Sequence, residues 1–178
     1  MTVIVCPLHE VPDQLLQSKP ARMISLLSPD QPAPEAPADM SRLVLRFHDI
    51  GEPREGLIAP DRAMIIDLLA FGAAWREPGP LLIHCWMGVS RSPAAALALA
   101  CALDPTRDEA DIANTLRQAS PIATPNPLMI ALADGLMQRE GRLIAASAQI
   151  GRGAEALHGT AFRFPGRPAS LERLPVST

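Results

Sequence analysis

The sequence predicts a single α/β domain with a central, mainly parallel sheet of four to five strands flanked by helices. Three observations predict this fold class. The chain has 178 residues, which suits one domain and is long enough to bury a full core. Short apolar runs alternate with longer segments of helical periodicity, as in strand–helix–strand units with parallel strands. Clusters of Pro and Gly separate these segments and mark the turns between them.

The expected elements follow from these runs in chain order. Strands are predicted at residues 3–5, 21–27, 43–47 and 81–83. Helices are predicted at residues 11–18, 62–75, in the Ala/Leu run after Pro93, at 108–119, and from 127 to about 149. Four prolines between residues 28 and 39 predict an irregular surface loop.

The domain is expected to end near residue 150. We predict one folded domain over residues 1–150 and a loop-like tail over residues 151–178, because Gly and Pro recur in the tail without periodicity. Phe162 and Phe164 are the tail side chains suited to dock it to the body.

Composition excludes several classes of protein. A net charge of −3, few aromatic residues and no Tyr disfavour nucleic-acid binding. No apolar run is long enough for a membrane span, and three Cys without paired spacing favour the reducing cytoplasm. The four His are scattered, so we expect neither a metal nor another cofactor. The oligomeric state is left open.

The chemistry of the chain is concentrated where the fourth predicted strand ends. The residues there are, in order, His84, Cys85, Trp86, Met87, Gly88, Val89, Ser90, Arg91 and Ser92. A five-residue connection from a strand to a helix N-terminus can turn its amides toward one centre, and Gly88 allows a positive φ. The helix dipole and the planar donor fork of Arg91 attract an anion to the same centre. These residues therefore predict a phosphate site.

A thiol in such a field ionises readily, so Cys85 is expected to be a thiolate nucleophile. Thiolate and phosphate together predict in-line attack on phosphorus, a phosphocysteine intermediate and its hydrolysis. The loop amides and Arg91 are expected to hold the equatorial oxygens. Ser92 is expected to donate a hydrogen bond to the departing sulfur, and His84 to orient the loop.

Two regions of the chain resemble a known family. Residues 84–92, HCWMGVSRS, resemble the active-site signature of the cysteine-dependent protein tyrosine phosphatase superfamily: His-Cys, five residues, Arg, then Ser or Thr. Residues 116–126, LRQASPIATPN, with the apolar helix that follows, are similar to the late region of dual-specificity phosphatases. The resemblance spans roughly residues 21–137 and is to the bacterial, dual-specificity-like type. It implies the protein tyrosine phosphatase fold and hydrolysis of phosphate monoesters, either on a phosphorylated protein or on a small phosphate ester, with phosphotyrosine or dual specificity.

The resemblance also implies a general acid on a loop upstream of Cys85. Asp49 follows the third predicted strand, where loops gather around α/β active sites, so we assign to it protonation of the leaving oxygen and activation of water. Asp61 is the alternative, although it is better placed to cap the helix that begins after it. Asn126 is expected to cap the last helix and to support the catalytic loop.

Other functions and roles stay open at this point. A pseudophosphatase would bind phosphorylated partners without turnover, and a sulfur- or arsenate-handling enzyme would also use a thiolate beside an anion. Asp49 disfavours the sulfur chemistry, which needs no acid at that place. The absence of Tyr leaves the substrate undefined. Cys6 is expected to be a small buried residue, with a protective disulfide to Cys85 as the alternative.

Overall fold

A five-stranded sheet in the order β3-β2-β4-β1-β5 is the centre of the computed structural model, which describes residues 1–166. The strands are β1 (Thr2–Pro7), β2 (Arg22–Leu27), β3 (Ser41–Arg46), β4 (Leu81–Cys85) and β5 (Phe162–Pro165). The first four strands are parallel to one another, and β5 pairs antiparallel with β1. The predicted mainly parallel sheet is confirmed.

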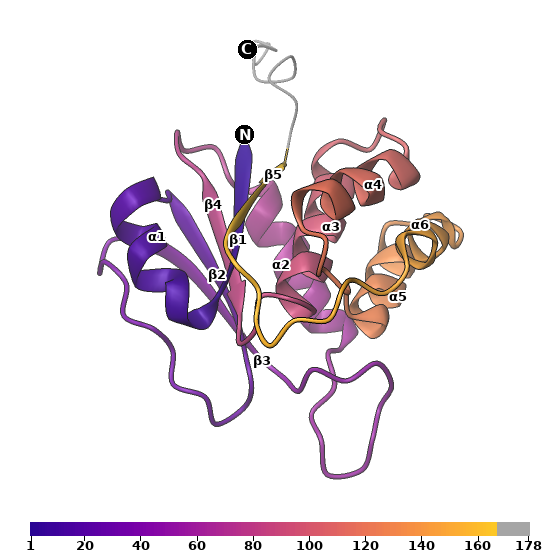
Figure 1. Ribbon diagram of the computed structural model, residues 1–178, viewed down its shortest axis with the longest axis horizontal. Helices are drawn as coiled ribbons and strands as arrows, with labels where there is room; N and C mark the ends of the chain where they lie inside the picture. Colours follow the sequence, from indigo (N-terminus) through magenta and orange to yellow (C-terminus); the bar gives the residue numbers. More distant parts are fainter. Residues whose placement is uncertain (167–178) are drawn as a thin grey trace.

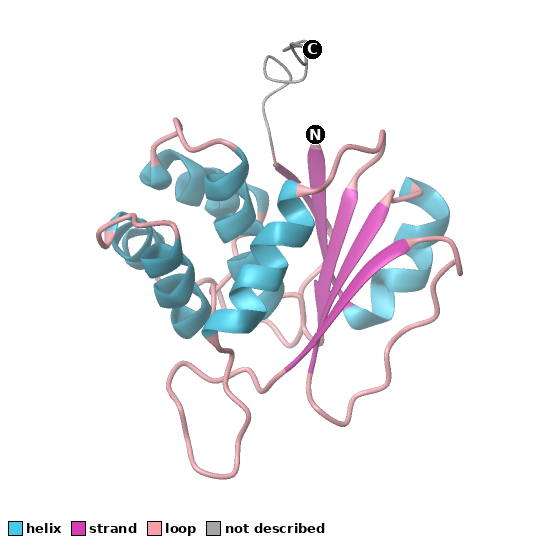
Figure 2. Cartoon of the chain, turned by 180° about the vertical axis from the view of Figure 1, so that it is seen from behind, coloured by secondary structure: helices cyan, strands magenta, loops and turns pink. Residues whose placement is uncertain are grey.

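Helices cover both faces of this sheet, but unequally. They are η1 (Leu8–Glu10, a short 3-10 helix), α1 (Val11–Ser18), α2 (Arg62–Ala73), α3 (Arg91–Leu103), α4 (Glu109–Ala119), α5 (Pro127–Leu136) and α6 (Arg142–Ile150). Figure 1 shows α1 on one side of the sheet and α2 to α6 on the other, and Figure 2 shows the same two layers from behind. The larger core therefore lies between the sheet and the helices α2 to α6.

Strand β4 and helix α3 form the middle of this core. Every residue of β4 is buried, because the strand lies between β2 and β1. Helix α3 is also buried along nearly its whole length, and its Ala residues let neighbouring helices approach closely. At Gly72 of α2, for instance, a Cβ atom would lie only 2.2 Å from the Leu99 side chain. The connection between β4 and α3 is thus fixed at both ends.

The long helix expected from residue 127 to about 149 is two helices, so that prediction is wrong. Helix α5 ends at Leu136, and Gln138, Glu140 and Gly141 have left-handed φ angles of 55°, 53° and 84°. The buried Asp134 carboxylate accepts hydrogen bonds from backbone N–H groups at the start of α6, those of Gly141, Leu143 and Ile144. These bonds cap α6 and offset the strain of the two left-handed side-chain-bearing residues.

The chain after α6 belongs to the sheet. The expected loop-like tail is wrong at Phe162–Pro165, which forms strand β5 and closes the β1 edge. Phe164 docks as expected, since its ring is 1% exposed in the main core. The last residues of that predicted tail, 167–178, lie outside the described part.

No helix within residues 1–166 is both long and apolar enough to cross a lipid bilayer.

Candidate active site

Cys85 and Arg91 lie at the two ends of one short loop, between the central strand and the central helix. Cys85 is the last residue of β4 and pairs in register with Pro7 of β1. Arg91 is the first residue of α3. Both side chains are buried, with exposed fractions of 1% and 3%. The structure thus brings together the thiol and the guanidinium that the sequence singled out.

The loop of residues 86–90 is held from outside through its carbonyl groups. Four carbonyl oxygens of this 86–90 loop accept hydrogen bonds from backbone N–H groups of three other parts of the chain. These bonds are Leu8 N to Trp86 O (3.1 Å), Gly159 N to Met87 O (2.7 Å), Thr124 N to Val89 O (2.8 Å) and Asn126 N to Ser90 O (3.3 Å). Because the carbonyl groups are bonded outward, the amide groups of the loop are left for an anion.

Most N–H groups of the 86–90 loop have no protein acceptor among residues 1–166, as the outward-bonded carbonyl groups lead us to expect. Gly88 donates its N–H to the Cys85 sulfur at 3.3 Å. Within residues 1–166, the N–H groups of Met87, Val89 and Ser90 donate to no protein acceptor. Gly88 has a φ of +70°, and a Cβ atom there would lie 2.7 Å from the backbone nitrogen of Pro7. Only Gly therefore fits the point where the loop passes the end of β1.

Ser92 contacts the sulfur, and Arg91 is held in place by Phe47. The Ser92 hydroxyl lies 3.1 Å from the Cys85 Sγ. The Arg91 Nη1 donates to the carbonyl oxygen of Phe47 at 2.9 Å, and the guanidinium lies over the Phe47 ring. The Arg91 Nε is buried and donates no hydrogen bond within the described residues. One donor of the fork is therefore fixed to the protein, and another remains for a bound anion.

Asp49 lies beside this loop and contacts both Ser90 and Arg91. Its Oδ1 accepts hydrogen bonds from the Ser90 hydroxyl at 2.7 Å and from the Asn126 side-chain amide at 2.8 Å. Its Oδ2 lies 3.8 Å from the Arg91 Nε. Asp61, the alternative, accepts from the Met64 N–H and caps α2. The capping prediction for Asp61 is confirmed, and Asp49 is the carboxylate that contacts the loop.

Asn126 connects three segments. Its side-chain oxygen accepts from the Met129 N–H and caps α5, as predicted. Its side-chain N–H₂ group donates to Asp49 and also to the Ile50 carbonyl, and its backbone N–H donates to Ser90. Asn126 thus fixes the Asp49 segment relative to the 86–90 loop.

His84 is the buried residue that precedes Cys85 in β4, and its side chain bonds to the neighbouring strand β2. Its Nε2 is 2.7 Å from the Ser25 hydroxyl, because Ser25 of β2 pairs in register with His84. Burial, with smaller contributions from the positive charges of Arg42 and Arg91, lowers the pKa of His84 to about 4. His84 is therefore neutral at physiological pH and acts through hydrogen bonding.

The remaining side chains near the site differ in exposure. Trp86 and Met87 point outward, with exposed fractions of 55% and 37%, so their side chains do not line the anion site. We call that site, formed by the amide groups of the 86–90 loop, the Cys85 sulfur and the Arg91 guanidinium, the cradle. Cys6 is a free buried thiol that packs in the smaller core beneath α1, and burial raises its pKa. Burial raises the pKa of Cys101 to about 12. Within residues 1–166, no three His, Cys, Asp or Glu side chains gather as metal ligands would.

The sequence interpretation missed the groups that hold the site in place. The Ser90 side chain, Ser25, the Phe47 carbonyl and Gly159 all bond to predicted site residues. Ser25 had a recognisable signal, since it is a polar residue within an apolar strand. The Phe47 carbonyl and Gly159 had none, because backbone contacts between distant segments leave no mark in composition.

Solved structures of dual-specificity phosphatases share this architecture. DUSP15 matches with a TM-score of 0.61 at 21% identity, covering 85% of this chain and 92% of its own. Human DUSP28 matches with a TM-score of 0.57 at 24% identity, covering 73% and 82%. A putative mouse dual-specificity phosphatase, solved in complex with zinc tungstate, matches with a TM-score of 0.54 at 22% identity, covering 75% and 79%.

No protein-family model and no curated protein sequence matches the chain. Because these structures share only 21–24% of their sequence with this chain, the similarity shows a common fold. The chain shares the fold of these dual-specificity phosphatases, as the resemblance implied.

Proposed function

We propose that this chain is a cysteine-dependent protein phosphatase that hydrolyses phosphate monoesters, phosphotyrosine above all, through a phosphocysteine intermediate. The observation that carries the proposal is the 86–90 loop. Four of its carbonyl groups are bonded outward, and within residues 1–166 the N–H groups of Met87, Val89 and Ser90 donate to no protein acceptor. The loop joins a buried thiol to a buried guanidinium whose Nε has no hydrogen-bond partner among the same residues. That combination suits a tetrahedral dianion and a nucleophile beneath it.

In the first step, the Cys85 Sγ attacks phosphorus in line, and the bond to the leaving oxygen breaks. The free loop amides and the Arg91 Nε hold the equatorial oxygens as charge redistributes in the transition state. Asp49 delivers a proton to the leaving oxygen, since its carboxyl group lies beside Ser90 and Arg91 at the edge of the cradle.

In the second step, water attacks the phosphocysteine and Cys85 leaves as a thiolate. Asp49, now a carboxylate, accepts a proton from that water. The Ser92 hydroxyl, 3.1 Å from the sulfur, donates a hydrogen bond to the thiolate as it forms. Neither step calls for a metal or for another cofactor.

Hydrolysis of p-nitrophenyl phosphate by the purified chain tests the proposal. Cys85→Ser should lower kcat at least about 10³-fold, because the hydroxyl is a far weaker nucleophile than the thiolate. Cys101→Ser is the matched control, since Cys101 is buried in α3 away from the loop. Acid quenching of the wild type during turnover should trap one phosphoryl group on Cys85, detected by mass spectrometry.

Binding of tungstate, measured by calorimetry, separates the other functions. The wild type and Cys85→Ser should both bind it, because the amides and Arg91 remain. Tungstate binding without hydrolysis by the wild type would identify a pseudophosphatase. Turnover that survives Cys85→Ser would exclude the covalent route.

A further inference from the structure

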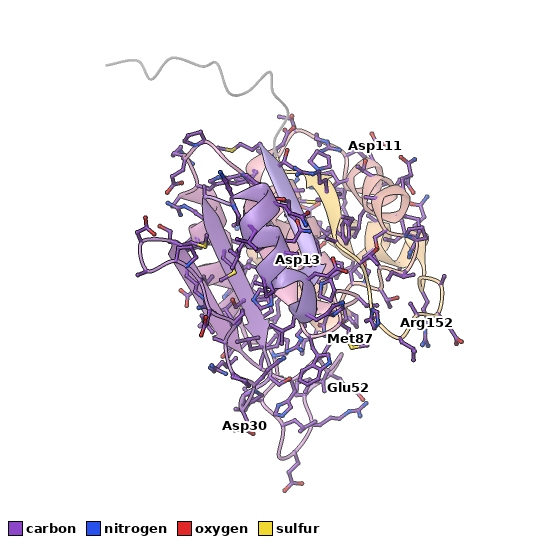
Figure 3. All side chains as sticks on the ribbon, turned by 60° about the vertical axis from the view of Figure 1, so that its left-hand side comes forward. Asp13, Asp30, Glu52, Met87, Asp111 and Arg152 are labelled. Atoms are coloured by element: carbon purple, nitrogen blue, oxygen red, sulfur yellow. The ribbon has the colours of Figure 1, made fainter. Side chains whose placement is uncertain are left out.

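A groove of about 680 Å³ adjoins the 86–90 loop on the side of Asp49 and Ser90. It lies between the loop, residues 124–127 and helices α5 and α6, and we call it the side groove. Figure 3 labels Met87 of the loop and Arg152 beyond α6, both below Asp111 of α4 in this view. Because Asp49 and Ser90 belong to its wall, the side groove borders the proposed catalytic site.

The walls of the side groove are mainly apolar. Val89, Pro125, Ile130 and Ile144 line it, and Ile144 on α6 is 45% exposed. A large aliphatic side chain held open to solvent beside a reaction centre offers contact area to a ligand. The lining is therefore suited to an apolar group attached to the phosphoester.

Arg152 stands at the outer end of the side groove. It also lines a second hollow of about 420 Å³, which shares Val89 and Thr124 with the side groove and continues toward Leu157. Within residues 1–166, Arg152 makes neither a hydrogen bond nor an ion pair. An unpaired guanidinium at this place is complementary to an anionic group that lies beyond the apolar one.

We propose that the side groove is a substrate subsite that selects phosphotyrosyl peptides carrying an aliphatic residue near the phosphotyrosine and an acidic residue beyond it. The aliphatic side chain packs against Val89 and Ile144, and the acidic side chain pairs with Arg152. This inference rests on the proposed phosphatase function, and it adds the class of peptide that the site prefers.

The charge around the groove favours a peptide over a membrane lipid. Attraction to an anionic membrane surface needs a cluster of basic residues, about four to eight. The linings of the two hollows include one basic residue, Arg152, and two acidic residues, Asp49 and Glu155. A single acidic side chain on a peptide matches one Arg, whereas a lipid surface would be repelled by the carboxylates.

A positional scan of phosphotyrosyl peptides with the full chain tests this proposal. At each position flanking the phosphotyrosine, Leu is compared with Ser, and Glu with Lys, by kcat/KM. We expect one position where Leu is favoured over Ser about tenfold, and a more distant one where Glu is favoured over Lys about threefold at low ionic strength. Equal values at every position would overturn the proposal.

Variants assign these preferences to the groove, since each ratio is measured within one variant and is independent of its specific activity. Ile144→Gln should bring the Leu/Ser ratio to about one, and Arg152→Glu should reverse the Glu/Lys ratio. Ile66→Gln on α2 and Arg163→Glu on β5 are the matched controls, since both lie outside the groove lining and should keep the wild-type ratios. Ratios that persist in the groove variants would overturn the assignment.

Two further measurements distinguish an error in the proposed function from an error in the subsite or in the choice of a peptide. Wild-type protein that leaves p-nitrophenyl phosphate intact would overturn the proposed function itself, whereas hydrolysis of that ester without any peptide preference would overturn only the subsite. A phosphoinositide presented in phosphatidylcholine vesicles should be a poorer substrate than the best peptide. A higher kcat/KM for the vesicle substrate would overturn the choice of a peptide.

Discussion

Asp49 is held by two donors on one oxygen, and this arrangement defines a clean test of its role. Asp49→Asn keeps an oxygen that can accept from Ser90 and Asn126, but it removes the transferable proton. Hydrolysis of phenyl phosphate, a poor leaving group, should fall about 10²-fold in kcat, because its oxygen departs only when protonated. Hydrolysis of p-nitrophenyl phosphate should fall only a few-fold, since that leaving group is stable as an anion.

Asp61→Asn is the matched control for this experiment. Asn caps a helix about as well as Asp, so α2 should persist with the Met64 N–H still bonded. If Asp61→Asn, rather than Asp49→Asn, shows the dependence on the leaving group, the general acid is Asp61.

His84 makes the stability of the protein depend on pH. Its pKa is about 4 in the folded chain against an ordinary value of 6.5, so between these values the unfolded chain binds the proton and the folded chain does not. The free energy of unfolding should therefore fall as the pH falls from about 6.5 to about 4. This one group accounts for a loss of about 2 kcal/mol between about pH 7.5 and about pH 5.

Urea unfolding of His84→Gln at the two pH values measures this contribution. The variant should lose about 2 kcal/mol less than the wild type over that interval, because Gln does not titrate. His9→Gln is the control, since the His9 side chain is mostly exposed, and it should follow the wild type. An unchanged pH dependence in His84→Gln would show that other groups cause it.

At the scale of elements, the break between α5 and α6 depends on one buried carboxylate. Asp134→Ala removes the acceptor of the Gly141, Leu143 and Ile144 N–H groups and should lower the free energy of unfolding by about 2–3 kcal/mol. Urea unfolding measures this loss, and Asp67→Ala on the exposed face of α2 is the control. Equal stability of the two variants would mean that packing alone fixes the break.

Arg139 also holds the turn between α5 and α6 in place. Arg139, between the two helices, is buried and donates to Glu109 of α4 and to the Cys101 carbonyl of α3. The turn is thus tied to two other helices, which explains why the chain leaves the helical path that its periodicity allows.

At the scale of the whole molecule, the segment after α6 connects the sheet edge to the catalytic loop. Figure 1 shows this chain running from α6 past the carboxyl ends of the strands to β5. Gly159 donates to Met87, Ala161 donates to the Glu10 carboxylate, and Phe164 is buried in the main core. The segment that was expected to be a separate tail is therefore part of the folded unit.

Truncation tests this integration. A chain that ends at Ile150 should lose at least about 3 kcal/mol in the free energy of unfolding, because Phe164 burial and the bonds to the loop are removed. Its kcat/KM for p-nitrophenyl phosphate should also fall, since Met87 loses its outer partner. A chain that ends at Gly166 keeps β5 and is the control. Equal urea midpoints for the two truncations would contradict the structural role of β5.

Much of the site was predictable because it is contiguous. Residues 84–92 carry the nucleophile, the loop and the arginine within one strand–loop–helix unit, and local sequence largely determines such a unit. The partners of Asp49 were not predictable in the same way. Ser90 and Asn126 lie 41 and 77 residues from it along the chain, and each bond contributes only about 1 kcal/mol.

The sequence by itself determined the alternation of strands and helices, the placement of Cys85 and Arg91 at the two ends of one loop, and the cap at Asp61. Periodicity, Gly88 and capping residues act over a few residues, so they are readable locally. Only the tertiary structure decided that Asp49 meets Ser90 and Asn126, that residues 162–165 add a strand, and that Arg152 lines a groove beside the catalytic loop. These contacts depend on how the whole core packs, because no single one of them is strong enough to be specified by its own segment.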